Sequence, residues 1–337
     1  MAAALDWDAL MRRAFDAARL GPARGVNPQV GCVLVSPSGD VLAVGHHRGA
    51  GTAHAEVDAL SQLSPEQARG ATAVVSLEPC NHTGRTGPCA QALIDAGIAR
   101  VVYAVSDPGD ASSGGAQRLR DAGVEVLGGV LTEEGESLLG SWLVAARLGR
   151  PWVIVKWAQS LDGRAAANDG SSQWITSPES RADVHRERSL ADGIAVGTGT
   201  VLADDPALSA RDGDGLFAEQ PVPVVFGRRA IPETARLRGG AHEFIQVDGI
   251  ELSADLATLP GRGIRTLFVE GGPTLASALL RSGLVDELLV YQAPLLLGGA
   301  RRAIEDLGIA SLSEAQVWRF TELTRLGSDI KLRAVKG

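Results

Sequence analysis

Short apolar runs alternate with segments of mixed polarity along the first half of the chain. Apolar runs bounded by turn residues predict strands, and apolar residues at helical spacing predict helices between them. The predicted strands are 32–36, 41–45, 73–77, 100–105 and 124–127, and the predicted helices are 5–20, 55–63, 89–96, 117–122 and 132–148. This alternation is typical of an α/β layer architecture.

A Gly-Arg-Pro sequence at 149–151 interrupts the pattern, and we expect a domain boundary near residues 145–151. The alternation then resumes, with segments 213–220 and 236–240 interpreted as variable loops. A length of 337 residues also favours two domains, 1–147 and 148–337. The predicted strands of the second half are 152–157, 193–196, 222–226, 244–247, 264–269 and 287–291, and the predicted helices are 181–191 and 274–282.

Composition narrows the class of protein. The hydrophobic fraction is 45% and the charged fraction 21%, as in ordinary globular proteins. A net charge of -8 without a block of Lys or Arg argues against a nucleic-acid surface. We expect no membrane span, because no run of 18 apolar residues occurs, and no secretory leader, because charges interrupt the N-terminal segment. With only three cysteines, a protein of the reducing cytoplasm is the simplest interpretation.

A split set of metal ligands is the clearest chemical signal. His54 is followed two residues later by Glu56, and Cys80, preceded by Pro79, is followed by Cys89. One imidazole and two thiolates are typical of a catalytic zinc site, which keeps a further position for water. Both motifs follow predicted strands and lie at predicted helix N-termini, so they can meet at one end of a sheet. The pattern is that of zinc deaminases of nucleobases and related rings, with Glu56 as the proton shuttle.

Each of these residues alone has a simpler interpretation. The histidine could be an imidazole whose hydrogen bonds are made within the protein, and each cysteine could be a small buried thiol. Cys32 lies inside an apolar predicted strand, and we favour core packing for it. His46, His47 and His82 could bind a polar ring or a phosphate near the metal, or be solvated loop residues, and spacing does not separate these alternatives. Arg85 is a natural phosphate partner because its guanidinium is planar.

The second half carries a weaker nucleotide-binding signal. Gly271 and Gly272 follow a predicted strand and open a predicted helix. Glycines let a backbone approach a phosphate closely, and a helix N-terminus favours an anion. The pattern is not the Rossmann motif, and two glycines before a helix are more often only a turn. A Gly/Thr-rich loop at 196–200 adds support, and four arginines could hold phosphates or form a solvated helix face: Arg181, Arg186, Arg188 and Arg211.

Together these motifs resemble the bifunctional riboflavin-biosynthesis deaminase–reductase family. The resemblance runs from about Trp7 to about Gly299 and weakly beyond. It includes the eight-residue gap between Cys80 and Cys89, where transfer-RNA and cytidine deaminases usually have two residues. Its motifs are 27–32 (Asn-Pro-Gln-Val-Gly-Cys), 54–57 (His-Ala-Glu-Val), 77–86 (Leu-Glu-Pro-Cys-Asn-His-Thr-Gly-Arg-Thr), 156–164, 172–177 and 199–206.

The resemblance implies an N-terminal cytidine-deaminase-like, three-layer αβα domain and a C-terminal dihydrofolate-reductase-like domain. The first, 1–147, would be a zinc-dependent deaminase that removes the 2-amino group of 2,5-diamino-6-ribosylamino-4(3H)-pyrimidinone 5′-phosphate. The second, 148–337, would be an NADPH-dependent reductase that converts the ribosyl side chain to ribityl. The resemblance also implies one Zn²⁺ per chain and a small-molecule pyrimidine ribotide as substrate. It further implies a homo-oligomer, either a dimer or a tetramer.

The resemblance further implies roles for individual residues. Zinc would be held by His54, Cys80 and Cys89, with Glu56 as catalytic proton shuttle. Deaminase substrate contacts would be Asn27, His47, His82, Arg85, Thr86 and Asp107. Cofactor contacts would be Ala158, Trp174, Thr200, Asp204, Gly272, Pro273, Thr274, Leu275, Ala276, Ser277 and Ala278. Reductase substrate contacts would be Ser172, Arg188, Leu208, Arg211 and Glu270.

The sequence departs from the family pattern at a few positions. Gly109 stands where the family often has Asn, and Gly227 where many members carry Asp, so we expect altered contacts to the substrate and to the adenosine end of the cofactor. Asn81 replaces the more usual Ser, and Gly87 the more usual Pro.

Two other functions stay open. A deaminase of another nucleobase or of nucleic acid, with a second domain that is not a reductase, is opposed by acidic charge and Cys spacing. A noncatalytic zinc-stabilised interaction protein is opposed by the free Glu56.

Overall fold

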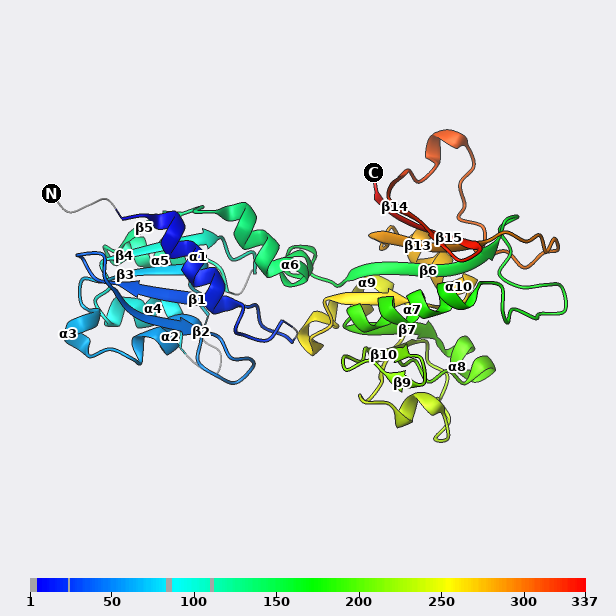
Figure 1. Cartoon of the computed structure of the whole chain (residues 1–337), viewed down its shortest axis with the longest axis horizontal. Coiled ribbons are helices and arrows are strands. Elements are labelled where there is room, and N and C mark those ends of the chain that lie inside the picture. The colour runs from blue at the N-terminus through cyan, green and yellow to red at the C-terminus, as the bar shows by residue number, and fades with distance from the viewer. Residues whose placement is uncertain (1–4, 24, 83–86, 110–111) are drawn as a thin grey trace. The chain divides into compact units, whose positions relative to one another are not determined.

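The computed structural model describes residues 5–23, 25–82, 87–109 and 112–337. It divides into two compact units, Met1–Arg147 and Leu148–Gly337 (Figure 1). Each unit has its own sheet and its own hydrophobic core. The α/β architecture expected from the alternating pattern is therefore confirmed, and each unit can be described by itself.

The first unit is built on a five-stranded sheet in the order β2-β1-β3-β4-β5. β1 pairs antiparallel with β2 and β3, whereas β3, β4 and β5 run parallel. β1 and β3 are buried along their whole length, as strands covered on both faces are. The strands are β1 Gly31–Val35, β2 Val41–His46, β3 Thr72–Leu77, β4 Arg100–Val105 and β5 Glu125–Gly128. The helices are α1 Trp7–Ala18, α2 Ala55–Leu60, α3 Pro65–Ala68, α4 Cys89–Asp95, α5 Gly115–Asp121 and α6 Thr132–Leu148.

The second unit is built on an eight-stranded sheet in the order β11-β10-β7-β12-β6-β13-β15-β14. The six strands from β11 to β13 run parallel, and β15 is antiparallel to both β13 and β14. The strands are β6 Trp152–Ser160, β7 Gly193–Gly197, β10 Val222–Phe226, β11 Ile245–Val247, β12 Thr266–Val269, β13 Glu287–Ala293, β14 Trp318–Leu326 and β15 Asp329–Lys336, with a small pair, β8 Arg211–Asp212 and β9 Gly215–Leu216. The helices are α7 Pro178–Leu190, α8 Thr198–Asp204, α9 Leu252–Ala257 and α10 Pro273–Arg281, with short 3₁₀ turns η1 Arg236–Gly239, η2 Pro260–Arg262 and η3 Leu312–Glu314.

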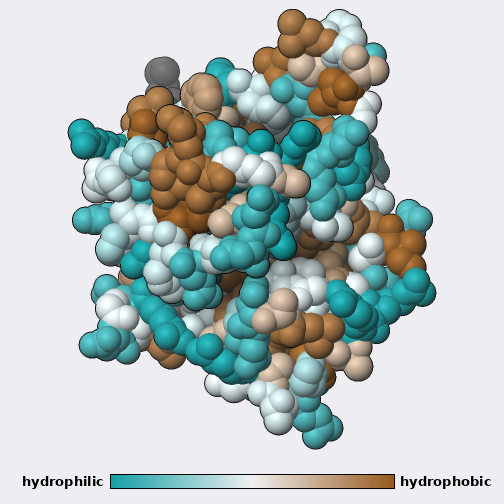
Figure 2. Space-filling model, turned by 90° about the vertical axis from the view of Figure 1, so that its right-hand side faces the viewer, coloured by the Kyte–Doolittle hydropathy of each residue, from teal (hydrophilic) through white to brown (hydrophobic). Residues whose placement is uncertain are grey.

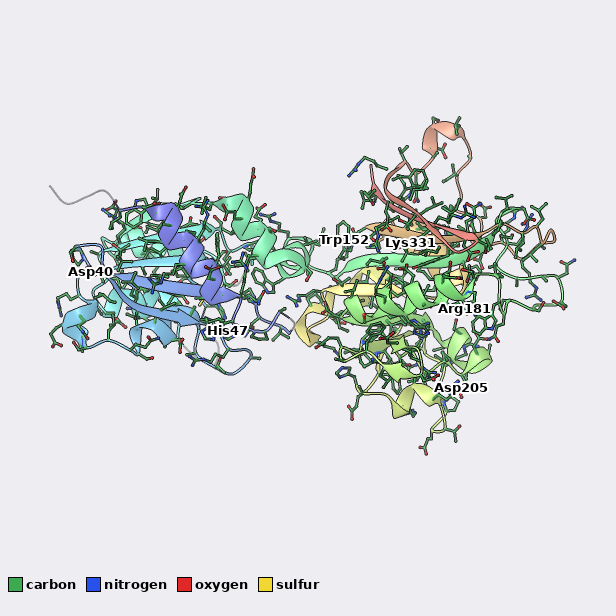
Figure 3. All side chains as sticks on the ribbon, viewed as in Figure 1. Asp40, His47, Trp152, Arg181, Asp205 and Lys331 are labelled. Atoms are coloured by element: carbon green, nitrogen blue, oxygen red, sulfur yellow. The ribbon has the colours of Figure 1, made fainter. Side chains whose placement is uncertain are left out.

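Several details of the predicted elements were wrong. The Gly/Thr-rich loop expected at 196–200 is instead the end of β7 and the first turn of α8. The helix expected over 132–148 is not continuous, because Gly140 has φ 46° and ψ −125° and kinks it. Segments 213–220 and 236–240, interpreted as loops, contain β9 and η1. η1 is held by a tertiary contact that no local pattern signals: the Arg236 N–H donates to the Asp205 carboxylate at 2.8 Å. Asp205 lies at the end of α8 (Figure 3).

A buried ionic cluster joins α7 to β13 and β15. The amine of Lys331 lies 2.6 Å from the Glu187 carboxylate and 3.0 Å from that of Asp183, and only 3% of its side chain is exposed (Figure 3). Burial disfavours its charge, yet hydrogen bonds to Glu187 and Asp183 leave the pKa of Lys331 raised. The Tyr291 hydroxyl donates to Asp183 at 2.7 Å, and burial with this bond raises the pKa of Tyr291. The cluster therefore fixes α7, which carries several residues of the cleft described below.

The surface of the second unit is mixed in character. On the face shown in Figure 2, hydrophobic patches are separated by hydrophilic residues. Large apolar side chains are exposed on β14, where Phe320 is 65% and Leu323 69% accessible. Among the described residues, no helix has both the length and the apolar character to cross a membrane.

Candidate functional site

The start of α2 presents two of the predicted functional side chains. His54 is the N-cap residue of the helix, with extended backbone at φ −71° and ψ 161°. Glu56 follows in the first turn, and its side chain is buried. Gly45 in β2 makes this placement possible, because a Cβ there would lie 2.4 Å from the backbone of Ala55 and of Ala59. The helix can therefore lie close against the sheet, and Glu56 is directed away from bulk water.

The two cysteines enter the same site from the segment after β3. Cys89 is the first residue of α4, and its backbone N–H donates to the Cys80 sulfur at 3.4 Å. The turn between β3 and Cys80 packs closely on α5, because a Cβ on Gly115 would lie 1.7 Å from the Pro79 carbonyl oxygen. Glu78 is a buried carboxylate that accepts the backbone N–H of Ala116 at 2.9 Å. These contacts position Cys80, and sequence reasoning assigned no such role to Glu78 or Gly115.

The three predicted ligand atoms converge. Nδ1 of His54 lies 3.2 Å from Sγ of Cys89 and 3.6 Å from Sγ of Cys80. All three donor atoms lie within 4.8 Å of one another, and within the described ranges these residues form the one such cluster of possible ligands. Zinc binds imidazole nitrogen at about 2.0–2.1 Å and thiolate sulfur at about 2.3 Å, so donors this close fit a single ion placed between them.

The electrostatics of the site favour a cation and a mobile proton. A hydrogen bond from Cys89 lowers the pKa of Cys80 to about 4, while the same bond and burial raise the pKa of Cys89. A divalent cation would favour the deprotonated form of both thiols, because coordinating thiols are deprotonated. Burial raises the pKa of Glu56, which brings this carboxyl closer to the range where it can both accept and release a proton.

Asn27 and His47 form a hydrogen-bonded pair next to the metal ligands. The amide nitrogen of Asn27 lies 2.9 Å from Nε2 of His47, and Nδ1 of His47 lies 2.9 Å from the Ala53 carbonyl oxygen. A carbonyl only accepts, so Nδ1 donates and Nε2 accepts from Asn27. The His47 ring packs edge-on against that of His54, with centroids 5.4 Å apart, and Figure 3 labels His47. The structure thus brings both predicted substrate contacts close to the ligand set.

Of the remaining predicted substrate contacts of this unit, the structure describes Asp107 and His82. Asp107 is buried just after β4, and its carboxylate accepts the Gly109 N–H at 2.9 Å. A Cβ on Gly109 would lie 2.4 Å from Oγ of Ser112, so the local backbone suits glycine. Nδ1 of His82 is buried and has no hydrogen-bond partner among the described residues. Arg85 and Thr86 lie outside the described residues.

A cleft of about 1580 Å³ lies on the second unit, at the carboxyl ends of its parallel strands. Ligands of open α/β sheets bind at this edge. The segments after β7 and β12 both contribute, as do residues of β6 and α7. Of the predicted contacts, the following line it: Ala158, Ser172, Trp174, Arg188, Thr200, Asp204, Leu208, Arg211, Glu270, Gly272 and Pro273.

The other predicted cofactor contacts, Thr274 to Ala278, do not line this cleft. Ala276 and Ser277 lie on the buried face of α10, and the Ser277 hydroxyl accepts the Glu305 N–H at 2.9 Å. Thr274 donates to the Glu305 carboxylate at 2.8 Å. Helical periodicity explains the difference, because only the first residues of a helix can face a ligand at its N-terminus, while later turns meet the core.

An ionic triad lies in the wall of the cleft. Arg188 makes a two-pronged ion pair with Glu270, at 2.5 and 2.9 Å, and the Lys156 amine lies 3.6 Å from the same carboxylate. Burial opposes ionisation of Glu270, but the charges of Arg188 and Lys156 lower its pKa to about 2. Burial lowers the pKa of Lys156. Sequence reasoning assigned no role to Lys156, although a lysine inside an otherwise apolar strand was a usable signal.

Trp174 is held at the cleft by Arg181. The guanidinium of Arg181 lies 4.7 Å from the centre of the indole ring, and it also donates to the Thr176 carbonyl at 2.7 Å. Trp174 is 68% exposed, so its ring is not fixed by burial in the hydrophobic core. The cation–π contact therefore orients a predicted cofactor contact.

Comparisons with known proteins match both units. The family described as the cytidine and deoxycytidylate deaminase zinc-binding region matches residues 6–105, and the RibD C-terminal domain matches residues 151–332. "Riboflavin biosynthesis protein RibD" of Mycobacterium tuberculosis (strain H37Rv) is 47% identical over 310 residues, 91% of each chain. The protein of that name from Escherichia coli (strain K12) is 40% identical, over 92% of this chain and 93% of the relative.

Solved structures are similar over both units. Acinetobacter baumannii RibD, form 2, has a TM-score of 0.75 at 35% identity, covering 98% of this chain and 99% of that one. A diaminohydroxyphosphoribosylaminopyrimidine deaminase/5-amino-6-(5-phosphoribosylamino)uracil reductase from Thermotoga maritima has a TM-score of 0.69 at 29% identity, with the same coverage. The similarity therefore extends over the whole fold, including both candidate sites.

Proposed function

We propose residue-level roles for this chain, which belongs to the RibD family of riboflavin biosynthesis proteins and is a bifunctional deaminase and reductase. In this proposal the first unit deaminates 2,5-diamino-6-ribosylamino-4(3H)-pyrimidinone 5′-phosphate, and the second reduces the ribosyl side chain of the product to ribityl. The observation that carries the proposal is the convergence of His54, Cys80 and Cys89 beside the buried Glu56.

In the first unit, one zinc ion per chain would be held by His54, Cys80 and Cys89. When bound, zinc lowers the pKa of water at its open position, so that hydroxide is available near neutral pH. Glu56 takes a proton from the attacking water, places it on a ring nitrogen, and later delivers a proton to the departing ammonia. The new C–O bond replaces the C–N bond of the 2-amino group, so the reaction consumes one water and releases one ammonia.

The Asn27–His47 pair would orient the pyrimidine ring. His47 accepts from the Asn27 amide nitrogen, which leaves the Asn27 carbonyl oxygen as an acceptor for a ring N–H or amino group. The Ala53 carbonyl fixes the tautomer of His47 in turn. Arg85 and Thr86 remain proposed partners of the ribotide phosphate on the basis of the motif alone.

In the second unit, the cleft would hold NADPH together with the deaminated ribotide. Its volume of about 1580 Å³ exceeds that of usual single-ligand pockets, about 300–1,000 Å³, as two such ligands require. The backbone at Gly271 and Gly272 lies at the N-terminus of α10, where a phosphate is stabilised. NADPH, when bound, supplies the hydride for ribose C1′, and Arg188, Arg211 and Glu270 would orient the ribotide.

Assembly and location complete the proposal. The exposed apolar side chains of β14, including Phe320 and Leu323, support a homo-oligomer, because large apolar surfaces mark contact sites. Light scattering during size-exclusion chromatography would report a dimer or a tetramer. The substrate is a small molecule, and the cytoplasm is the proposed location.

Glu56→Gln tests the proposal most directly. Glutamine keeps the size of the side chain and removes the transferable proton, so deamination should fall by about 10²- to 10⁴-fold with zinc content and folding unchanged. Reduction of the separately prepared deaminated ribotide by the same variant is the internal control and should not change. Loss of zinc together with deamination would contradict the proton-shuttle role, and a wild-type protein that cannot oxidise NADPH with the deaminated ribotide would contradict the reductase.

A further inference from the structure

An arginine lies at the margin of the cleft, on the turn after β10. Nε of Arg229 donates to the Thr198 hydroxyl at 3.2 Å. Thr198 is followed directly by Gly199 and Thr200, which line the cleft. A Cβ on Gly199 would lie 3.1 Å from Nη2 of Arg229, so the guanidinium lies close to the Gly199 backbone. Arg229 therefore places a positive charge next to a wall of the cofactor cleft.

The turn that carries Arg229 is held by its neighbours. Gly227 has φ +122°, a conformation that favours glycine, and its N–H donates to the Val247 carbonyl at 2.9 Å. The side-chain amide of Gln246 donates to the carbonyls of both Gly227 and Arg229, at 2.7 and 2.9 Å. The backbone position of Arg229 is thus fixed by β11, so the guanidinium is presented from a defined point.

No described residue neutralises the charge of Arg229. In the described part of the chain, Thr198 is the one side chain to which Arg229 hydrogen-bonds, and no carboxylate pairs with it. Gly227 contributes to this arrangement, because a Cβ at that position would lie 2.7 Å from the Thr198 hydroxyl that holds the guanidinium. The structure therefore offers an anion a guanidinium that is already oriented.

Sheet order relates Arg229 to the reacting end of the cleft. In the ionic triad, Lys156 lies in β6, Glu270 follows β12 and Arg188 reaches them from α7, whereas Arg229 follows β10. β10, β7, β12 and β6 are consecutive neighbours in the sheet. Two strand spacings of about 4.8 Å separate β10 from β12 and three separate it from β6, which gives about 10 Å to the strand of Glu270 and about 14 Å to that of Lys156. An extended dinucleotide with its nicotinamide at the triad would bring its adenosine ribose toward Arg229.

We propose that Arg229 binds the 2′-phosphate of NADPH and thereby selects NADPH over NADH. The inference rests on the proposed reductase function. A phosphate dianion is the group that distinguishes the two cofactors, and a guanidinium suits it because its planar array of donors matches phosphate oxygens. Gly227 assists by leaving room for Thr198 to hold the arginine.

Direct binding measurements on the intact, zinc-loaded protein test this inference. The fluorescence of NADPH and of NADH would be titrated against wild type, Arg229→Gln and Arg228→Gln. Arg228 is the matched control, because it is the adjacent exposed arginine of the same turn. Loss of charge-assisted hydrogen bonds should raise the Kd of Arg229→Gln for NADPH by about 10- to 100-fold. Its Kd for NADH should change by less than about 2-fold, and Arg228→Gln should resemble wild type for both cofactors.

Other outcomes separate the alternatives. Equal weakening of NADPH and NADH by Arg229→Gln would overturn the inference and assign the residue to the shared pyrophosphate or to folding, and thermal unfolding of the variant would distinguish these two. Unchanged NADPH binding would overturn the inference alone. Binding of neither cofactor by the wild type would overturn the reductase function and the inference with it. Gly227→Ala offers a second variant, because its Cβ would displace the Thr198 hydroxyl that holds Arg229, and it should weaken NADPH binding more than NADH binding.

Discussion

The two sites differ in how their functional groups are assembled. In the first unit, four side chains from two short motifs are the proposed ligands and proton shuttle, and the three ligand atoms lie within 4.8 Å of one another. In the second unit, the cleft is lined by segments from Lys156 to Asp306, and many of its contributions come from backbone and from paired charges. One site is a compact cluster of side chains, and the other is an extended cleft for which we propose two ligands.

The difference follows from the chemistry that each site performs. Hydrolytic deamination needs a metal and one acid–base group at a single carbon, and both can be supplied by residues near helix N-termini. Hydride transfer is carried out by the cofactor, so the protein mainly has to align two large molecules. A single substitution or the loss of the metal should therefore reduce activity strongly at the compact centre. A single substitution in the extended cleft should have a smaller effect.

Removal of the metal is expected to produce the largest difference between the activities of the two units. Dialysis against a chelator should reduce deamination by at least about 10³-fold, because no other group supplies the nucleophile. Reduction of the deaminated ribotide with NADPH should change by less than about 2-fold, since no predicted zinc ligand lies in the second unit. Both activities would be measured on the same sample, and restored deamination after zinc addition is the control. Equal loss of both activities would show that the sites are not independent.

Replacement of the buried lysine tests how α7 is held in the second unit. Lys331→Met would remove the buried cation between Asp183 and Glu187, whose lysine side chain is 3% exposed, and would leave only the more exposed Arg186 and Arg333 as their cationic partners. Breaking a buried ion pair by removing one partner costs about 3–5 kcal/mol. Urea unfolding should show this loss in the free energy of unfolding. Lys336→Met, at an exposed lysine of the same strand, is the control and should cost less than about 0.5 kcal/mol. A variant as stable as wild type would show that the cluster contributes no net stability.

The ionised Glu270 should make the second unit sensitive to acid. Its pKa is about 2 in the folded protein, below the ordinary value of 4.5, so the folded state binds a proton less readily than the unfolded state. The stabilisation is therefore complete above about pH 4.5 and is lost as the pH falls towards 2. Its upper limit is about 3 kcal/mol, from the size of the pKa difference. The difference in unfolding free energy between wild type and Glu270→Gln should shrink from pH 5 to pH 2.5, and a constant difference would contradict the assignment.

Much of the fold was predictable because buried strands leave a continuous apolar signal. The strands over 100–105 and 222–226 have the predicted bounds. The hairpin of β14 and β15 was not predicted, because β14 lies at the sheet edge and exposes Phe320 and Leu323 among polar residues. Its sequence therefore lacks the uniform apolar run that marks an interior strand.

The residues of the metal site could be predicted from the sequence more completely than those of the cleft. The convergence of His54, Cys80 and Cys89 follows from ligand chemistry, since few other residue types can replace an imidazole or a thiolate on zinc. In the cleft, the predicted run 272–278 includes Ser277, which is buried in the core, because a stretch of sequence does not reveal which helix face meets a ligand. Arg229 was missed because only tertiary structure brings it to Thr198 and distinguishes it from Arg228.

The smallest expected effect concerns the stacking of Arg181 on Trp174. Arg181→Ala removes a cation–π contact to a ring that is 68% exposed, and such contacts are worth about 0.5–1 kcal/mol at exposed sites. We expect the KM for NADPH to rise by about 2- to 5-fold, with little change in kcat, because the residue orients a cofactor contact and does not touch the reacting atoms. Arg186→Ala, on the same helix, is the control. A fall in kcat with unchanged KM would place Arg181 at the reacting end of the cleft, and the extended site would then be more like the compact zinc centre than its geometry indicates.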